Sequence, residues 1–436
     1  MLYPPSRAPR AIWPSKGKVR LNVFPESRTP AHRCVRTRFG AAIALTALIA
    51  ASQPASASSV SVLHAFSGAE GAFPQGQLFY ALINKAVVVA GTAQGGGAQG
   101  DGSVFDYNLF NGRFADIHDF AGSPTDGFNP LGGVALNASL SHLGSIAGVT
   151  SEGGANNDGA LWTISPQGVE SLVYSFGSVP NPNNPNSPLD GTSPEGTLAQ
   201  AFDGNFYSTT STGGQNNLGT VFRYSPSSGT VTSVYSFGAS TTDAALPQEG
   251  LVLGFNHLLY GTSTNGGANS QGAVYSITTS GPEKVLYSFG SLAGAADGAN
   301  PQCLLAVDPH GNIWGTAPNG GLGAGTVWEI SNNAFRVVYT FPPSGANGSA
   351  PIAGLSFGPH DLLYGTASAG GANGDGVIYS INPATGAFSK VHDFNATTDG
   401  SDPLGTLLLQ PLSQSFYGTT GSDGPNGFGT LFRFKP

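Results

Sequence analysis

The sequence predicts an all-β fold, a seven-bladed β-propeller of four-stranded blades. Three observations predict it: a motif that occurs seven times, a second motif that alternates with the first, and a composition rich in turn-forming residues. The chain has 64 Gly and 31 Pro among 436 residues, and only 10% of its residues are charged. Proteins built from long helices take about half of their residues from Ala, Glu, Lys, Leu and Arg, so that class is excluded. The hydrophobic content of 39% is enough to bury a core.

The first motif reads apolar, aromatic, Gly, Thr, a polar stretch with Gly-Gly, a Gly/Asn turn, and then a small, an apolar and an aromatic residue. Its clearest copies are LYGTSTNGGANSQGAVY at 259–275 and LYGTASAGGANGDGVIY at 363–379. The seven copies recur every 51–60 residues and end at Phe105, Trp162, Phe222, Tyr275, Trp328, Tyr379 and Phe432. A period of this length indicates one supersecondary unit repeated along the chain.

The second motif reads apolar, Tyr or His, small or Asp, Phe. It occurs at 63–66, 117–120, 173–176, 234–237, 286–289, 338–341 and 391–394. Each copy is followed by an acid or Asn, and four residues later by Pro. Two interleaved motifs with equal counts define seven units.

Each unit divides into four short strands, A to D, separated by Gly, Asn or Pro. In the fourth copy these are GLVLGF (250–255), HLLYGTS (257–263), GAVYSIT (272–278) and EKVLYSF (283–289). A four-stranded unit of this size is typical of a propeller blade. A D-type strand at 59–66 precedes the first unit and a C-type strand at 429–434 ends the last, so we expect the two to pair and close the ring. An open solenoid is the alternative.

The first 57 residues are predicted to be a basic n-region and a secretory signal peptide. An apolar run at 39–51 follows three Arg and precedes the small-residue triplet 55–57. The run is too short to span a membrane, which takes about 20 residues. The domains are therefore a signal at 1–57 and a propeller at 58–436, secreted or periplasmic and without a membrane span. After the first 38 residues the chain has 24 acidic and 8 basic residues, which excludes a nucleic-acid partner.

With its pattern LYGT-x-S-x-GG, then G-T-V-F, then LYSF, the chain resembles the secreted bacterial proteins known as choice-of-anchor tandem repeat GloVer-containing proteins. The likeness covers all seven units. More remotely, Gly-Gly after the second strand and an aromatic residue in the third are similar to kelch repeats. The resemblance implies an exported propeller and does not imply a particular biochemical activity.

One set of polar residues keeps the register of the repeat at the D–A connection. We call this set the acidic ring: Glu70, Asp126, Asp190, Asp243, Asp297, Asn347 and Asp399. Because D–A and B–C loops emerge on the same face of a propeller, we expect it on one loop face. Each Asp can simply cap its own turn by accepting backbone N–H bonds. The other interpretation is a face that binds a sugar or a cation, with Ca²⁺ as the candidate ion, since hard cations take oxygen ligands.

The sequence has no P-loop, no HExxH and no Gly-x-Ser-x-Gly elbow. His64, His118 and His392 stand where other copies of the second motif have Tyr, so they are expected to be packing residues, and Cys303 is expected in the core. We therefore expect no required cofactor and a monomeric, non-catalytic scaffold that binds an extracellular or periplasmic glycan, protein or cation. The alternative is a hydrolase or lyase acting on polysaccharide, with two carboxylates at the propeller mouth as acid and base.

Overall fold

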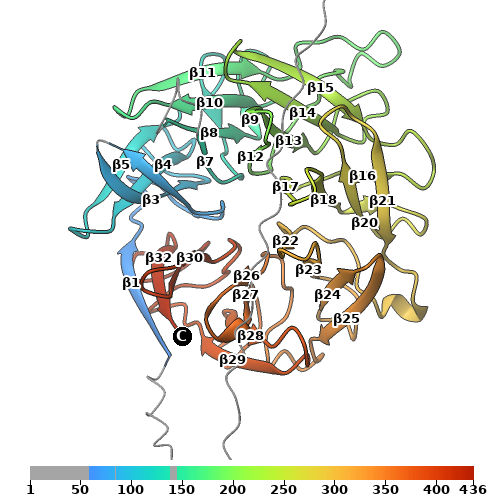
Figure 1. The fold of residues 1–436 in the computed structure, drawn as a ribbon. Helices are drawn as coiled ribbons and strands as arrows, with labels where there is room; N and C mark the ends of the chain where they lie inside the picture. Colours follow the sequence, from blue (N-terminus) through green and yellow to red (C-terminus); the bar gives the residue numbers. More distant parts are fainter. Residues whose placement is uncertain (1–57, 84, 138–144) are drawn as a thin grey trace, which may run out of the picture. The chain divides into compact units, whose positions relative to one another are not determined.

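The computed structural model describes residues 58–83, 85–137 and 145–436, which belong to one compact unit, Ser56–Pro436. The predicted signal at 1–57 lies outside the described residues. The unit is a ring of seven four-stranded antiparallel sheets, which are the blades of a β-propeller (Figure 1). The fold class predicted from the repeat is confirmed.

The blades are numbered along the chain. Blade 1 comprises β2 (Phe79–Ile83), β3 (Ala86–Ala93), β4 (Ser103–Asn108) and β5 (Phe114–Asp119). Blade 2 comprises β7 (Ala135–Asn137), β8 (Ser145–Thr150), β10 (Ala160–Ile164) and β11 (Glu170–Ser175). Blade 3 comprises β12 (Ala199–Gln200), β13 (Phe206–Thr210), β14 (Thr220–Ser225) and β15 (Thr230–Ser236). Blade 4 comprises β17 (Val252–Leu253), β18 (Leu259–Ser263), β20 (Ala273–Ile277) and β21 (Glu283–Ser288).

Blade 5 comprises β22 (Ala306–Val307), β23 (Ile313–Ala317), β24 (Thr326–Ser331) and β25 (Ala334–Thr340). Blade 6 comprises β26 (Ser356–Phe357), β27 (Leu363–Ala367), β28 (Val377–Ile381) and β29 (Phe388–Asp393). Blade 7 comprises β30 (Leu408–Gln410), β31 (Ser415–Thr420), β32 (Thr430–Lys435) and β1 (Ser59–Ala65).

Short additional elements lie in the connections. Two-residue strands pair as β6 (Gly127–Phe128) with β9 (Glu152–Gly153) and as β16 (Ala244–Ala245) with β19 (Asn265–Gly266). These ladders join a D–A connection to the B–C loop of the next blade, so both kinds of loop share one face, as expected. The 3₁₀ turns are η1 (Ala293–Ala295) and η2 (Pro359–Asp361). Within the described ranges, no helix has the length and hydropathy that a membrane span requires.

The first motif builds the inside of each blade. Tyr379 in β28 lies opposite Gly365 in β27, and a Cβ atom on Gly365 would come within 2.6 Å of the Tyr379 hydroxyl oxygen. The Gly of the motif therefore leaves room for the aromatic residue of the next strand. All seven closing aromatic residues have no exposed surface. Burial of such large side chains is the main stabilising contribution in each blade.

The Pro of the second motif packs one unit against the next. A Cβ on Gly272, whose φ is +95°, would lie 2.6 Å from Cδ of Pro301. The same Gly–Pro pair occurs at all seven positions of the repeat. Glycine is required here both by the left-handed φ and by the close approach of the neighbouring Pro ring. Cys303 lies just beyond this contact and is buried in the core, as predicted.

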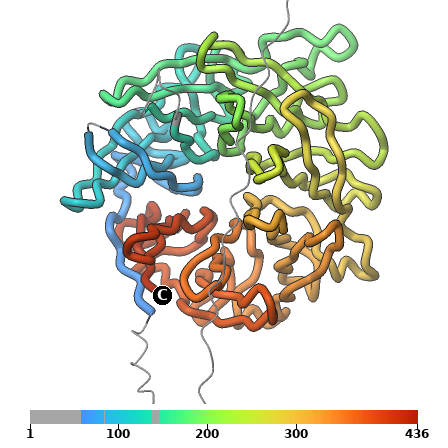
Figure 2. Tube along the Cα trace, viewed as in Figure 1, coloured from blue at the N-terminus to red at the C-terminus, as the bar shows by residue number. Residues whose placement is uncertain are grey.

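The strand at the start of the described chain completes blade 7. β1 pairs antiparallel with β32, from Ser59 opposite Lys435 to Ala65 opposite Thr430, and the blue start of the tube runs beside the red C-terminal strand in Figure 2. Phe66, which follows β1, has no exposed surface. That this pairing holds the ring closed against unfolding stays a prediction.

Candidate functional site

Each member of the acidic ring is hydrogen-bonded to the Tyr or His of the D strand that precedes it. Tyr donates its hydroxyl to Asp in three repeats, Asn347 donates its amide to Tyr339, and His replaces Tyr in the other three. The pairs are His64–Glu70 (3.0 Å), His118–Asp126 (3.1 Å), Tyr174–Asp190 (2.8 Å), Tyr235–Asp243 (2.8 Å), Tyr287–Asp297 (2.7 Å), Tyr339–Asn347 (2.9 Å) and His392–Asp399 (2.7 Å). The interchange of Tyr and His predicted from the sequence thus has a shared hydrogen bond as its reason.

The six acids of the ring also cap their own turns. Asp190, for example, accepts hydrogen bonds from the backbone N–H groups of Ser178 and Val179, both at 3.0 Å. The other five carboxylates each accept at least one N–H from the D–A turn. These bonds match the turn-capping interpretation. The acids do not converge, because each is bound within its own repeat beside an outermost strand, and Ca²⁺ binding by the ring stays a prediction.

Polar residues of the B–C loops have a similar structural use. Asn269 donates from its side-chain amide to the backbone carbonyl of Phe289 at 3.0 Å. The same bond joins three further B–C loops to the end of the D strand in their own blade. These amides fix the B–C loops to the D strands, so their hydrogen-bonding groups are already used within the fold.

A cavity of about 240 Å³ lies on the propeller axis, since every blade contributes to its lining. Each contribution is the residue directly after the Pro of the second motif: Gln75, Leu131, Glu195, Gln248, Gln302, Ile352 and Leu404. Because these residues follow the D–A connections, the cavity opens on the same face as the acidic ring. We call these seven residues and Glu249 the channel mouth.

The channel mouth has a polar arc and an aliphatic arc, and Gln75 and Leu131 of blades 1 and 2 complete the ring between them. Blades 3 to 5 place Glu195, Gln248, Glu249 and Gln302 next to one another in ring order, so this arc carries carboxylates and amides. Blades 6 and 7 supply aliphatic side chains on the next arc, Ile352 and Leu404. The residue directly after Pro therefore differs in chemistry from blade to blade. The residue four positions after Pro, in contrast, is a buried Leu or Val in every blade.

Glu249 is the most unusual residue of the mouth. The other six blades have Gly, Ala or Cys at its register position, two residues after Pro. Its side chain lines the mouth and also a narrower cavity of about 50 Å³ that is shared with Gln77 and Thr406. Its carboxylate accepts a hydrogen bond from the N–H of Gly250 at 3.0 Å. Burial, assisted by the negative charge of Glu195, raises the pKa of Glu249 to about 7.

The second carboxylate of the mouth is Glu195. Burial raises its pKa above the ordinary value, although a hydrogen bond from Ser211 at 2.9 Å opposes the shift. An acid with a perturbed pKa in a cavity is a candidate functional group. Sequence analysis missed both residues because it searched for polar residues in register. The available signal was the departure from register, a Glu directly after Pro194 and another two residues after Pro247.

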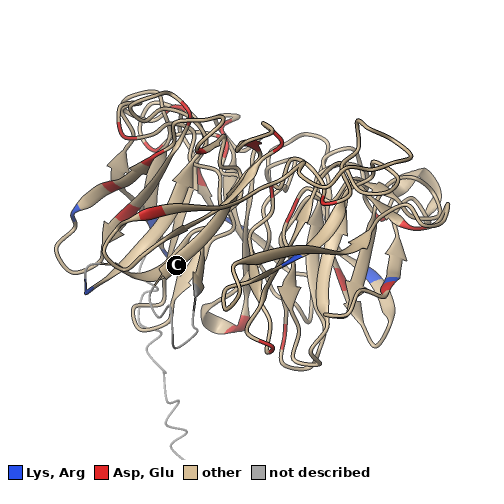
Figure 3. Cartoon of the chain, turned by 90° about the horizontal axis from the view of Figure 1, so that it is seen from above, with Lys and Arg blue, Asp and Glu red and all other residues tan. Residues whose placement is uncertain are grey.

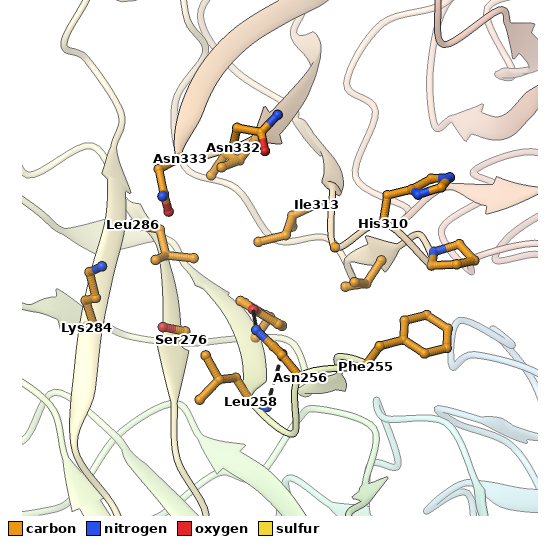
Figure 4. Close-up of a pocket in the computed structure, with 15 residues that line it drawn as sticks. Phe255, Asn256, Leu258, Ser276, Lys284, Leu286, His310, Ile313, Asn332 and Asn333 are labelled. Atoms are coloured by element: carbon orange, nitrogen blue, oxygen red, sulfur yellow. Dashed lines mark hydrogen bonds between the residues drawn. The ribbon is translucent and has the colours of Figure 1, made fainter. Parts of the chain in front are cut away.

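A larger pocket of about 500 Å³ lies between blades 4 and 5, at the A–B and C–D turns. Figure 4 shows Phe255 and His310 on one side, Lys284 on the opposite side, and Asn332 and Asn333 along the rim. Its floor is aliphatic and its lining contains neither Asp nor Glu. Its titratable side chains include His310 and Lys284, and it lacks the carboxylates that the channel mouth has.

The charge of the chain limits the ligands that suit the mouth. Acidic side chains outnumber Lys and Arg, 25 to 17 in the sequence, and red segments exceed blue ones in Figure 3. Two carboxylates in an acidic protein repel anions and attract cations, so the mouth suits neutral or cationic ligands.

No curated protein matches the chain. Among solved structures, oligogalacturonate lyase from Vibrio parahaemolyticus matches with 12% identity and a TM-score of 0.48, over 86% of this chain and 93% of that chain. A chain of a nidogen/laminin complex matches with 12% identity and a TM-score of 0.43, over 73% and 97%. TolB from Acinetobacter baumannii matches with 12% identity and a TM-score of 0.38, over 69% and 62%. With TM-scores below 0.5, no argument about function rests on these similarities.

The family comparison agrees with the repeat. The model of the Gloeobacter/Verrucomicrobia repeat matches twice, at residues 186–323 and 304–436, which together cover more than half of the sequence. The chain belongs to the Gloeobacter/Verrucomicrobia repeat family.

Proposed function

We propose that this protein is an exported, non-catalytic binding protein that takes the end of a glycan chain at the channel mouth. One observation carries the proposal: the channel mouth is where all seven blades converge and where the repeat gives way to a mixture of carboxylates, amides and aliphatic side chains. Elsewhere on the same face, the repeated acids are occupied by hydrogen bonds within their own turns.

A sugar unit matches the two arcs of the mouth. Gln248, Gln302 and the two Glu supply donors and acceptors for hydroxyl groups. Ile352 and Leu404 supply an apolar wall for the C–H face of a pyranose ring. Because Glu249 has a pKa of about 7, its carboxyl group can donate a hydrogen bond as well as accept one near neutral pH. A neutral or amino sugar is therefore favoured over an acidic one.

A glycan array followed by calorimetric titration tests this proposal. We expect the full chain to bind a group of related glycans, and Gln302→Ala to weaken that binding about tenfold, since one or two hydrogen bonds are lost. Gln167→Ala, at an exposed turn of blade 2, is the matched control and should leave the affinity unchanged. Equal binding by wild type and Gln302→Ala would place the glycan elsewhere.

A polysaccharide hydrolase or lyase is the second candidate, and the raised pKa of Glu249 beside Glu195 favours it specifically. A carboxyl group that titrates near 7 suits a general acid. Reducing-end assays on plant and bacterial polysaccharides distinguish the two functions. An enzyme would release new ends and lose that activity in Glu249→Gln, whereas a binding protein would release none.

A further inference from the structure

A second departure from the repeat lies at the outer edge, where each D strand meets the next blade. The residue four positions before the Tyr or His of a D strand packs against the Tyr or His of the preceding blade. Phe114 stacks on His64 with ring centroids 3.6 Å apart, and Phe335 stacks on Tyr287 at 3.7 Å. This position completes an aromatic contact between neighbouring blades in three repeats, at Phe114, Phe335 and Phe388, and holds Val in two others.

At the boundary between blades 1 and 2 the same position holds Glu170, the first residue of β11. Its neighbours across the boundary are His118 of β5 and Asp126 of the D–A connection. One ligand atom of each of the three residues lies within 4.8 Å of the other two. Among the described residues this is the single group of three or more His, Cys, Asp and Glu side chains with such spacing.

One carboxylate oxygen of this group is left without a hydrogen-bond partner among the described residues. Within the described part of the chain, Oε1 of Glu170 is buried and has no hydrogen-bond partner. Burial and the charge of Asp126 raise the pKa of Glu170. Burial acts to lower the pKa of His118, but its hydrogen bond to Asp126 and the charges of Asp126, Glu170 and Asp119 outweigh burial and raise it. At His64, which faces Phe114 instead of a carboxylate, burial prevails and the pKa is lowered.

We propose that His118, Asp126 and Glu170 form a Zn²⁺ site that joins blade 1 to blade 2. Imidazole nitrogen and carboxylate oxygen are both ligands of this ion, with bonds of about 2.0–2.2 Å, and three protein ligands leave one position of the tetrahedron open. In a tetrahedron of that size the donor atoms are about 3.4 Å apart. Nε2 of His118 and Oδ2 of Asp126 are already 3.1 Å apart. Binding of the ion releases the Nε2 proton of His118 to solvent and replaces its hydrogen bond to Asp126 with one bond from each residue to Zn²⁺. Glu170 must also approach, and within the described ranges its Oε1 has no hydrogen bond to give up.

The site differs from the acidic ring in its geometry. It uses one member of the ring, Asp126, whose Oδ1 accepts the N–H of Gly127 at 2.6 Å. Its Oδ2 faces the histidine and also accepts the N–H of Ala121 at 3.0 Å, which fixes the direction of the carboxylate. The His118 side chain is 19% exposed, so a fourth ligand such as water can reach the ion. Two ligands come from blade 1 and its outgoing connection and one from blade 2. Zn²⁺ would therefore clamp the boundary.

The chain contains a natural counterpart that lacks the histidine. At the boundary between blades 3 and 4, Glu283 faces Asp243, and the residue in the place of His118 is Tyr235. Burial and the charge of Asp243 raise the pKa of Glu283 to about 8. There a proton relieves the repulsion between the two carboxyl groups, whereas at the first boundary a metal ion takes that role.

Zn²⁺ titration of the full chain, without a histidine tag and after EDTA treatment and dialysis, tests the proposal. We expect one Zn²⁺ per chain by calorimetry, a rise in melting temperature, and absorption bands of tetrahedral Co²⁺ when cobalt replaces zinc. His118→Tyr and Glu170→Phe should each abolish these signals. Both variants recreate pairs that the chain uses at other boundaries, so they should fold, and their melting temperatures in EDTA report this directly.

His392→Tyr is the matched control, because His392 pairs with Asp399 at 2.7 Å in a two-residue contact. It should leave the stoichiometry and affinity for Zn²⁺ unchanged. Failure of wild type to bind Zn²⁺, or retention of binding in both site variants, would overturn the proposal. A response to Ca²⁺ without one to Zn²⁺, removed by Asp190→Ala, would overturn it in favour of a calcium ring.

Discussion

The outer edge and the channel mouth use acidic residues in opposite ways. At the edge, Asp190 accepts four hydrogen bonds, from a tyrosine, two backbone N–H groups and a hydroxyl. At the mouth, Glu249 accepts one and lies in a cavity where its pKa rises to about 7. Asp190 therefore stabilises the fold, whereas ionised Glu249 lowers the stability of the fold. In this molecule, departure from the repeat therefore marks the residues on which the proposed function rests.

The largest effect is expected from removing the strand that completes blade 7. A chain that begins at Gly68 lacks β1 and Phe66, which leaves β32 as an exposed edge. Loss of the buried Phe66 and of the half-buried Val60, Val62 and Leu63 should lower the free energy of unfolding by on the order of 5 kcal/mol relative to a chain that begins at Ser58. Urea unfolding of the two chains measures this difference. Coincident unfolding curves would show that β1 does not hold the ring closed.

A smaller loss is expected at the acidic ring. Asp190→Ala removes four hydrogen bonds at a residue that is 4% exposed, and should lower the free energy of unfolding by about 3 kcal/mol. Tyr174→Phe removes only one of these bonds and should lower it by about 1 kcal/mol. Neither variant should change glycan binding. A change below about 0.5 kcal/mol for Asp190→Ala would argue against the capping role.

Sequence alone predicted the fold because its evidence is periodic. The closing aromatic residue of the first motif and the Pro of the second motif appear seven times, and the Gly under the aromatic residue appears six times, with Ser208 in the third copy. Each has a steric reason that recurs with the repeat. The positions of the acidic ring could be predicted for the same reason, whereas the hydrogen bonds that cap the turns became visible only in the structure.

The two candidate sites could not be predicted in this way. The channel mouth combines one residue from each blade, and only the closed ring shows that Glu195 and Ile352 face the same cavity. The proposed zinc site joins His118 to Glu170, which are neighbours only because the D strands of adjacent blades pack four residues out of step. Contacts between blades depend on the geometry of the closed ring, so the spacing of residues in a single sequence does not reveal them.

The pH dependence of stability in Glu249→Gln tests the contrast between edge and mouth most directly. Since the pKa of Glu249 is raised from 4.5 to about 7, the folded chain keeps this proton at pH values where the unfolded chain has lost it. The associated stability is present below about pH 4.5 and is lost as the pH rises through 7. We predict that the free energy of unfolding of Glu249→Gln, relative to wild type, rises between these values by on the order of 1–3 kcal/mol. A difference that stays constant or falls with pH would contradict the account, because Glu249 would then carry no stability penalty at the mouth.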